Sequence, residues 1–301
     1  MLYDVPAPAK INLFLHVVGR RADGYHLLQS VFQFIDLCDT LHFDARADGR
    51  ITRSVDVPGV SVDDDLTLRA ARALQAATGV RAGVDITLIK RIPTGGGLGG
   101  GSSDAASTLI ALNRLWQCNL SRTDLMQIGL GLGADVPVFV FGQNAFAEGI
   151  GEQLTAVTLP ERAFVVAQPH VSVPTPEIFR AEDLTRDTFL ITIADFLTHP
   201  SASFGRNDLE SVVRRLYPSV GVGLDQLVRC ALAVSGADPS QSDAPVVRMS
   251  GSGSCAFVQC RNLHQAKLIE REVLATMQQG FRLVQACPGL IEHPLLHWIA
   301  N

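Results

Sequence analysis

The sequence predicts an α+β protein of two domains, and three observations lead to this class. The chain has 301 residues, which is enough for two domains that each bury a core. Apolar residues make up 47% and charged residues 18%, as in ordinary globular proteins. Segments with strand and helix periodicity are mixed, without the strict alternation that favours a parallel sheet. We expect one domain over residues 1–158 and a second over 159–301.

The clearest strand lies near the N-terminus. Residues 10–17 alternate with a period of two, so that Lys10 and Asn12 project from one face and an apolar row that starts at Ile11 occupies the other. A polar turn around Gly24 follows. The other strands that we expect in this half cover residues 31–37, 41–44, 51–57, 84–89 and a Val/Phe-rich run through Phe141.

Helices are predicted where apolar residues recur at helical spacing. Segment 66–77 is rich in Ala, Leu and Arg and ends at Gly79, and segment 103–116 has a leucine stripe. Ser121 and Asp124 have the spacing of a capping box at the start of another helix. In the second half we expect strands at 164–167, 246–249, 256–259 and 281–286, and helices at 209–216 and 264–277.

The bulk composition excludes several classes of function. The formal charge of −5 argues against nucleic acid as the main partner, because phosphate backbones attract basic surfaces. No apolar run reaches membrane-spanning length, and no basic segment followed by an apolar core opens the chain, so we expect a cytoplasmic protein without membrane contact. Six scattered cysteines and eight histidines lack metal-ligand spacing, so we expect reduced, buried thiols and no structural metal.

One segment carries most of the functional information. Residues 93–103 read Pro-Thr-Gly-Gly-Gly-Leu-Gly-Gly-Gly-Ser-Ser, with an alanine-rich helical pattern directly after them. Glycines allow a ligand to approach the backbone closely, and the start of a helix offers unpaired N–H groups and a positive dipole end. The segment is therefore predicted to bind phosphate.

Other phosphate-binding patterns fit this loop poorly. A P-loop requires lysine after its last glycine, where this chain has Ser102. A dinucleotide-binding loop follows the first strand and has an acid about 20 residues later, whereas here about ninety residues precede the loop and 119–121 reads Asn-Leu-Ser. The protein-kinase signatures are missing as well. A turn that serves only helix–strand packing is the remaining structural alternative.

Several separated motifs resemble a family of small-molecule kinases. Residues 93–106 resemble the second motif of the superfamily that phosphorylates galactose, homoserine, mevalonate and phosphomevalonate, the GHMP kinases. Residues 8–13 (Pro-Ala-Lys-Ile-Asn-Leu) resemble its first motif and residues 249–254 (Met-Ser-Gly-Ser-Gly-Ser) its third. The long glycine loop and Gly24-Tyr25-His26 resemble one branch, whose acceptor is a cytidine-diphosphate-linked polyol of the non-mevalonate isoprenoid pathway. Segments 133–137 and 174–179 extend the match, which runs from residue 6 to about residue 260.

The resemblance implies a fold, an activity and a catalytic pair. It implies a ribosomal-protein-like N-terminal half and a ferredoxin-like C-terminal half, with transfer of the ATP γ-phosphate to the 2-hydroxyl of the polyol. Asp135 matches the catalytic aspartate, which accepts or orients the hydroxyl proton. Taken alone, an aspartate between a glycine turn and an apolar run is equally well a helix cap or a solvated turn residue. Lys10 is the second candidate, because an ammonium near Asp135 keeps it ionised and offsets developing charge.

For the acceptor, the resemblance points to residues that would hold a cytosine. Tyr25 and His26 are candidates for stacking on the base and bonding its edge, and Phe179 matches the family's second stacking residue. Without the resemblance, core packing for Phe179 and a surface turn for Tyr25 and His26 are the simpler interpretations. Asn12 and Thr175 complete the predicted acceptor site, and His16 is expected to be structural.

For ATP, we expect backbone N–H groups across residues 95–103 to bind phosphate, and Ser102 or Ser103 to meet phosphate or Mg²⁺. Asp104 and Lys90 are placed near the nucleotide without an assigned role. Asp65 stands where relatives often have asparagine, so it is not assigned to adenine. The full set of predicted ATP-binding residues is Pro93, Gly95, Gly96, Gly97, Leu98, Gly99, Gly100, Gly101, Ser102 and Ser103.

Two other functions remain open at this point. A kinase of the same superfamily for another alcohol, such as homoserine or mevalonate, would not need Tyr25 and His26, since those acceptors carry no base. A nucleotide-binding sensor that has lost catalysis would not need both Lys10 and Asp135. We expect small-molecule substrates, and a monomer or weak homodimer.

Overall fold

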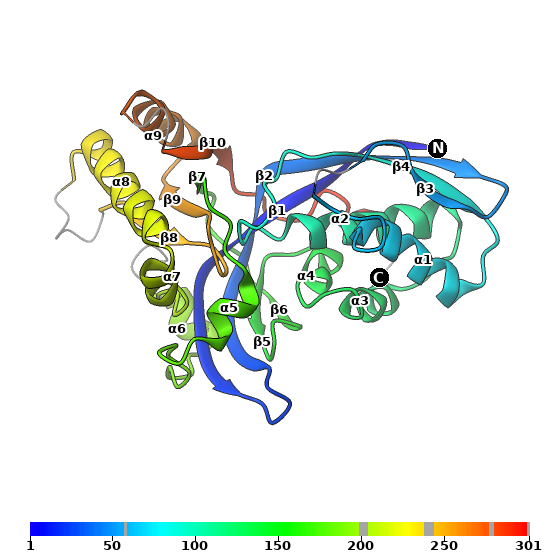
Figure 1. Cartoon of the computed structure of the whole chain (residues 1–301), viewed down its shortest axis with the longest axis horizontal. Coiled ribbons are helices and arrows are strands. Elements are labelled where there is room, and N and C mark those ends of the chain that lie inside the picture. Colours follow the sequence, from blue (N-terminus) through cyan, green and yellow to red (C-terminus); the bar gives the residue numbers. More distant parts are fainter. Residues whose placement is uncertain (57–58, 199–203, 238–243, 277–279, 300–301) are drawn as a thin grey trace.

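The computed structural model describes residues 1–56, 59–198, 204–237, 244–276 and 280–299. It has two halves, each built on one sheet, and a long hairpin that crosses from one to the other (Figure 1). Strands β1 (Leu2–Arg20) and β2 (His26–Arg46) form this hairpin, paired antiparallel from Leu2 opposite Phe43 to Arg20 opposite His26. This mixture of helices and largely antiparallel sheets confirms the predicted α+β class.

In the first half, helices cover one face of a six-stranded sheet. The sheet has the order β3-β4-β2-β5-β6, with β1 paired to β2. Its strands and helices are β3 (Ile51–Arg53), α1 (Leu66–Thr78), β4 (Gly83–Ile89), α2 (Gly100–Leu115), α3 (Arg122–Leu130), α4 (Val136–Phe141), β5 (Ala145–Glu148) and β6 (Gln153–Ala156). Helix α2 lies on β1 and β2, and α1 packs against α2.

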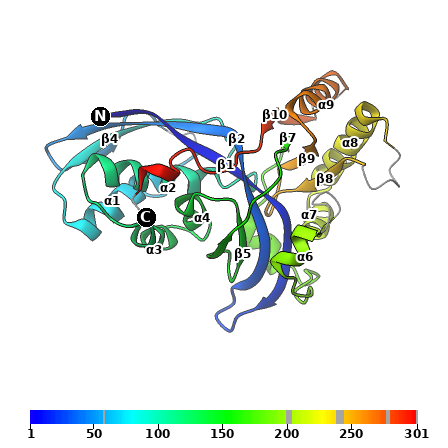
Figure 2. The ribbon, with the colours of Figure 1, turned by 180° about the vertical axis from the view of Figure 1, so that it is seen from behind.

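The second half is a four-stranded antiparallel sheet in the order β10-β7-β9-β8, with long helices α8 and α9 on one face (Figure 2). Its elements are β7 (Ala163–Pro169), α5 (Thr175–Arg180), α6 (Ile193–Thr198), α7 (Glu210–Leu216), α8 (Pro218–Ser235), β8 (Val246–Met249), β9 (Ala256–Cys260), α9 (Leu263–Thr276) and β10 (Phe281–Pro288). In β7, Val165 and Ala167 pack into the helix-side core, whereas Phe164 and Val166 face the core shared with the hairpin.

The two halves are in close contact through the hairpin and through the C-terminal segment. Ile11 and Phe14 of β1 share a buried cluster with Phe164 of β7. After β10, the chain returns to the first half, where the Asn144 amide donates to the carbonyls of Leu290 and Ile291 at 2.9 and 3.0 Å. A short 3-10 helix, Leu296–Trp298, then packs near α2. We propose a domain boundary at residue 159. The segment after β10 follows the second half in sequence but packs against the first half.

Several elements differ from the sequence-based prediction. Segments 31–37 and 41–44 belong to one strand, β2, and the predicted strand 51–57 is reduced to Ile51–Arg53, with Val57 outside the described residues. Residues 136–141 form the helix α4, because Pro137 suits a first helical turn and a short apolar run fits a buried helix as well as a strand. The polar face of β1 is also buried, since Lys10 and Asn12 are 3% and 2% exposed.

The helix predicted at 103–116 begins three residues earlier, at Gly100, and therefore includes the end of the glycine loop. The predicted helix at 264–277 is α9, with Met277 outside the described residues. Helix α8 was not predicted, because valine and glycine alternate over its first turns. Within the described ranges, none of the helices combines the length and the apolar character that crossing a bilayer requires.

Candidate active site

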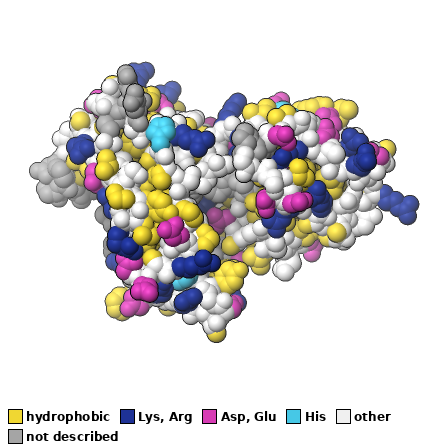
Figure 3. Space-filling model, viewed as in Figure 1, with side chains coloured by type: hydrophobic (Ala, Val, Ile, Leu, Met, Phe, Trp, Pro, Cys, Tyr) yellow, Lys and Arg dark blue, Asp and Glu magenta, His cyan; other side chains and the backbone are white. Residues whose placement is uncertain are grey.

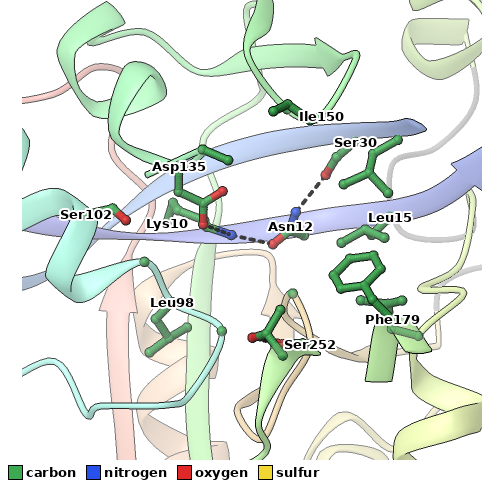
Figure 4. A pocket seen from close by; sticks show the side chains of 18 of the residues that line it. Lys10, Asn12, Leu15, Ser30, Leu98, Ser102, Asp135, Ile150, Phe179 and Ser252 are labelled. Carbon is green, nitrogen blue, oxygen red and sulfur yellow. Dashed lines mark hydrogen bonds and ion pairs between the residues drawn. The ribbon is translucent and has the colours of Figure 1, made fainter. Parts of the chain in front are cut away.

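A cleft of about 1030 Å³ lies between the two halves and gathers nearly all predicted site residues. Figure 3 shows the surface hollowed between the halves, and Figure 4 shows the cleft from close by. The predicted residues that line it are Lys10, Asn12, Tyr25, His26, Pro93, Gly95, Gly96, Gly97, Leu98, Gly99, Gly100, Gly101, Ser102, Asp135, Thr175 and Phe179. Its volume is at the upper end of the range for ligand sites, which suits two ligands side by side.

The glycine loop is held from both halves by its carbonyl groups. The N–H of Lys10 donates to the carbonyl of Leu98 at 3.0 Å, which ties the loop to β1. From the second half, the N–H of Cys255 donates to the carbonyl of Gly96 at 3.1 Å, and the Ser250 hydroxyl donates to that of Gly97 at 2.9 Å. The carbonyls therefore face protein on these sides, and the loop is fixed before any ligand arrives.

Glycine is required in this loop by the protein as much as by a ligand. Gly97 and Gly99 have φ values of 73° and 71°, in the region that other residues rarely adopt. A Cβ on Gly97 would overlap the Ser250 carbonyl, and one on Gly99 would lie 2.9 Å from the Phe139 ring. Close packing of the loop against both halves therefore adds to the ligand access expected from the sequence.

Helix α2 presents its N-terminus to the cleft. Gly99 occupies the N-cap without a side-chain bond, so the first N–H groups of the helix lack protein side-chain acceptors there. Ser102, in the first turn of this helix, also lines the cleft. Ser103 corrects the prediction: it is fully buried, its hydroxyl donates to the Pro8 carbonyl at 2.6 Å, and its N–H donates to Gly99. Ser103 therefore anchors the helix to β1.

The Lys10 ammonium lies 3.4 Å from the Asp135 carboxylate in this cleft. It also donates to Asn12 Oδ1 at 2.8 Å, and the Asn12 amide donates to the Ser30 hydroxyl at 2.8 Å (Figure 4). Nζ lies 4.9 Å from the centroid of the Phe32 ring, a cation–π contact. These contacts fix a nearly buried ammonium in the cleft wall, between β1 and the turn before α4.

Asp135 is oriented toward the cleft instead of toward its own helix. It occupies the N-cap position of α4, yet its carboxylate accepts no capping hydrogen bond. Its side chain is 38% exposed, against 4% for Lys10. The carboxylate therefore does not cap the helix. It is available to Lys10 and to a ligand in the cleft.

A second charged cluster lies under the start of α2. The Lys90 ammonium contacts Asp39 and lies 2.7 Å from Asp104, and the second oxygen of Asp39 accepts the N–H groups of Arg91 and Ile92. Burial alone lowers the pKa of Lys90, but the two carboxylates raise it above its ordinary value. Burial raises the pKa of Asp104 against the opposing effect of Lys90. Asp104 is thus engaged in a buried network.

Asp65, the residue left out of the adenine site, is engaged within the protein. It caps α1 through the N–H of Thr67 at 2.9 Å and accepts from Arg53 at 3.1 Å. The aspartate is therefore explained by a helix cap and an ion pair, without reference to a nucleotide.

The far end of the cleft carries the predicted base-binding residues. Tyr25, 59% exposed, and His26, nearly buried, lie at the turn of the β1–β2 hairpin. The His26 ring packs on Phe179 of α5, with centroids 5.0 Å apart and planes inclined by 34°. The Thr175 hydroxyl lies 2.6 Å from that of Ser252, which connects α5 to the turn between β8 and β9. Tyr25 and Phe179 are both in the cleft wall.

The sequence-based prediction missed several residues that shape the site. Ser250 and Ser252 lie in a motif that the sequence did mark, but neither received a role. Asn207 donates to the carbonyls of Met249 and Gly251 at 2.9 and 2.7 Å and so supports that turn. Arg186 contacts His26, and no pattern in the sequence singles it out.

The chain is similar to known kinases over its whole length. The family model described as the GHMP kinases N terminal domain matches residues 65–143. A Bordetella bronchiseptica 4-diphosphocytidyl-2-C-methyl-D-erythritol kinase is 60% identical over 100% of this chain and 99% of its own length, and one from Ralstonia nicotianae is 54% identical over 98% and 96%. A crystal structure of a 4-(cytidine 5'-diphospho)-2C-methyl-D-erythritol kinase, 34% identical, has a TM-score of 0.76 and covers 94% of this chain and 98% of its own.

A more distant structure defines the fold alone. A mevalonate kinase, 14% identical, has a TM-score of 0.64 and covers 97% of this chain and 99% of its own. The similarity to the curated kinases extends over the whole chain and includes every element that lines the cleft. The chain belongs to the 4-diphosphocytidyl-2-C-methyl-D-erythritol kinases of the GHMP kinase superfamily.

Proposed function

We propose that this protein transfers the γ-phosphoryl group of ATP to the 2-hydroxyl of 4-diphosphocytidyl-2-C-methyl-D-erythritol, giving the 2-phosphate and ADP. The observation that carries the proposal is the Lys10–Asp135 pair, which shares one cleft with the glycine loop and the start of α2. Phosphoryl transfer requires little covalent chemistry from a protein, but it requires aligned phosphates and a positioned acceptor. The start of α2 supports the first requirement and the Lys10–Asp135 pair supports the second.

In the proposed reaction, the acceptor hydroxyl oxygen forms a bond to the γ-phosphorus as the bond to the ADP oxygen breaks. Asp135 receives the hydroxyl proton, since its carboxylate has no capping role and is partly open to the cleft. Lys10, 3.4 Å from the Asp135 carboxylate, offsets the negative charge that develops on the transferred group. The N–H groups at the start of α2 hold the phosphates of ATP.

Mg²⁺ would fit this site as an ion that accompanies the phosphates of ATP. The Ser102 hydroxyl is a hard oxygen ligand close to the 133–135 turn, since its Oγ lies 3.9 Å from where a Cβ on Gly133 would stand. Asp104 is less suited, because it is buried against Lys90. Among the described residues, no cluster of three or more acidic, histidine or cysteine ligands forms a dedicated cage. We propose that Ser102 supports Mg²⁺, which would neutralise charge on the β- and γ-phosphates.

The acceptor's cytosine is assigned to the hairpin end of the cleft. Tyr25 and Phe179 supply aromatic faces, and the His26 ring supplies a hydrogen-bonding nitrogen. Galactose, homoserine and mevalonate carry no base, so these three residues favour the cytidyl acceptor over the other acceptors of the superfamily. Thr175 and Asn12 are proposed to contact the diphosphate and the polyol.

A coupled ADP-release assay with a panel of alcohols tests the proposal. We expect turnover with the cytidyl alcohol and none with homoserine or mevalonate. Turnover with either of those, and none with the cytidyl alcohol, would show that the acceptor has been assigned wrongly. We also propose a cytoplasmic location, which cell fractionation would test. For the oligomeric state we propose a monomer or weak homodimer, which light scattering would test.

A further inference from the structure

Arg186 contacts His26, the histidine at the base-binding end of the cleft. Its Nε–H donates to His26 Nε2 at 3.1 Å. The four remaining N–H groups donate to backbone carbonyls, so that every hydrogen of the guanidinium is used. These acceptors are Glu182 and Leu184 for Nη1, at 3.3 and 3.0 Å, and Phe179 and Ala181 for Nη2, at 3.2 and 2.6 Å.

This contact determines the tautomer of His26. A guanidinium has donors and no acceptor, so His26 Nε2 must present its lone pair to Arg186. In the neutral ring the proton is then on Nδ1. The ring is neutral near pH 7 because burial lowers the pKa of His26, and the charges of Arg186 and Arg20 lower it further. The tautomer therefore follows from the geometry, with the charge state in agreement.

The protonated nitrogen belongs to a ring that forms part of the cleft. His26 lines the cleft wall. Within the part of the chain that the structure describes, Nε2 is the His26 ring nitrogen with a hydrogen-bond partner, and Nδ1 is not among the buried unpartnered atoms. Nδ1 is thus open, and its N–H is the group that this ring can offer to a ligand.

We propose that Arg186 makes the site select cytosine over uracil, because it forces His26 to offer an N–H donor to the base. N3 of cytosine is a hydrogen-bond acceptor and pairs with this donor. N3 of uracil carries a hydrogen, so two donors would face each other and both would lose their water partners. The inference rests on the proposed function, since it assumes that a pyrimidine occupies this end.

The same guanidinium also places the stacking ring. It binds the Phe179 carbonyl, and the Phe179 ring packs on His26 at 5.0 Å. The hydrogen-bonding ring and the stacking ring are therefore held by one side chain at a fixed separation. Arg186 is a positioning residue, because it acts on the base through these two rings.

Binding of CDP and UDP, measured as competition with the acceptor, tests the role of Arg186. We expect the wild type to prefer CDP, and Arg186→Met to reduce the preference by about tenfold or more. Arg186→Lys keeps one donor toward His26 and should retain most of the preference. Arg215→Met is the matched control, since Arg215 pairs with exposed Asp183 in the same region without contacting His26. A folded Arg186→Met protein with the wild-type CDP:UDP ratio would overturn the proposal.

Nitrogen-15 NMR of histidine-labelled wild-type protein tests the tautomer independently of any substitution at Arg186. The His26 signals, assigned by loss in His26→Gln, should show Nδ1 protonated and Nε2 unprotonated. The opposite pattern would also overturn the proposal. These readouts differ from the alcohol panel: failure to phosphorylate the cytidyl alcohol refutes the function, whereas turnover with an unchanged base preference refutes only the role of Arg186.

Discussion

Lys10 is almost completely buried, yet its ammonium lies 3.4 Å from the Asp135 carboxylate, which is more than a third exposed. A pair of this kind contributes little to stability, because the buried charge loses its hydration and the exposed partner is screened by water. The asymmetry suits a reaction instead. The ammonium is fixed by Asn12 and Phe32, while the carboxylate remains accessible to a hydroxyl group in the cleft.

Asp135→Asn should lower kcat while leaving ATP binding close to wild type. The amide cannot accept the proton, and general-base contributions are typically about 10²- to 10⁴-fold. The loss should appear in kcat, measured by ADP release, with the ATP dissociation constant changed by less than about threefold because the phosphate loop is untouched. Asp225→Asn is the control, an exposed aspartate that pairs with Arg214 and is not part of the cleft lining. Wild-type kcat in Asp135→Asn would contradict the proposed role.

Gly97→Ala should destabilise the protein and weaken ATP binding together. The new methyl group overlaps the Ser250 carbonyl, and alanine is strained at a φ of 73°. Both effects together predict a loss of about 2–4 kcal/mol in the free energy of unfolding. Urea unfolding and ATP titration measure the two effects. Gly131→Ala, at a φ of −67°, is the control and should change stability by less than about 1 kcal/mol. Equal behaviour of the two variants would show that the loop tolerates a side chain.

The glycine loop was predictable from the sequence because its chemistry is local. Six glycines, two serines and a helical pattern lie within one short segment, so phosphate binding follows from the residues alone. The capping box of Ser121 and Asp124 is local in the same way, and the structure confirms it. The pairing of Lys10 with Asp135 is not local, and it was expected only through resemblance to a family.

What the sequence could not predict depends on contacts between distant segments. The role of Ser103 is decided by the Pro8 carbonyl, and that of Arg186 by a hairpin turn 160 residues away. Segment 136–141 became a helix because its apolar residues are buried on all sides, a setting that a strand and a helix share. Contacts between residues that are far apart in the sequence produce no periodic pattern in it.

Asp104→Asn should leave stability at neutral pH equal to or above that of the wild type. The Lys90 ammonium is shared by two buried carboxyl groups, those of Asp39 and Asp104. Oδ1 of Asp104 has no hydrogen-bond partner. The pKa of Asp104 is raised on folding, so the protonated form contributes stability below the unfolded pKa of about 4, and this is lost as pH rises. Urea unfolding at about pH 5 and about pH 8 should therefore show the variant gaining on the wild type at the higher pH.

Lys90→Met is the companion to this variant and should have the opposite sign. It leaves the Asp39 carboxylate buried beside Asp104 without its cation, which predicts a loss of about 3–5 kcal/mol in unfolding free energy at neutral pH. If both variants were neutral, the cluster would carry no electrostatic energy and its geometry would have been misread.

His293 should make the protein less stable as pH falls below about 6.5. Burial, with a smaller contribution from Arg122, lowers the pKa of His293 to about 3, and its Nδ1 accepts the N–H of Leu295 at 3.1 Å. Between about pH 6.5 and pH 3 the unfolded chain binds one more proton at this residue, so stability falls by up to about 1.4 kcal/mol per pH unit. His293→Asn keeps an acceptor near the Nδ1 position but does not titrate. Its unfolding free energy, measured from about pH 7 to about pH 4.5, should fall less steeply than that of the wild type, by about one proton. Parallel curves would mean that His293 is protonated equally in the folded and unfolded states.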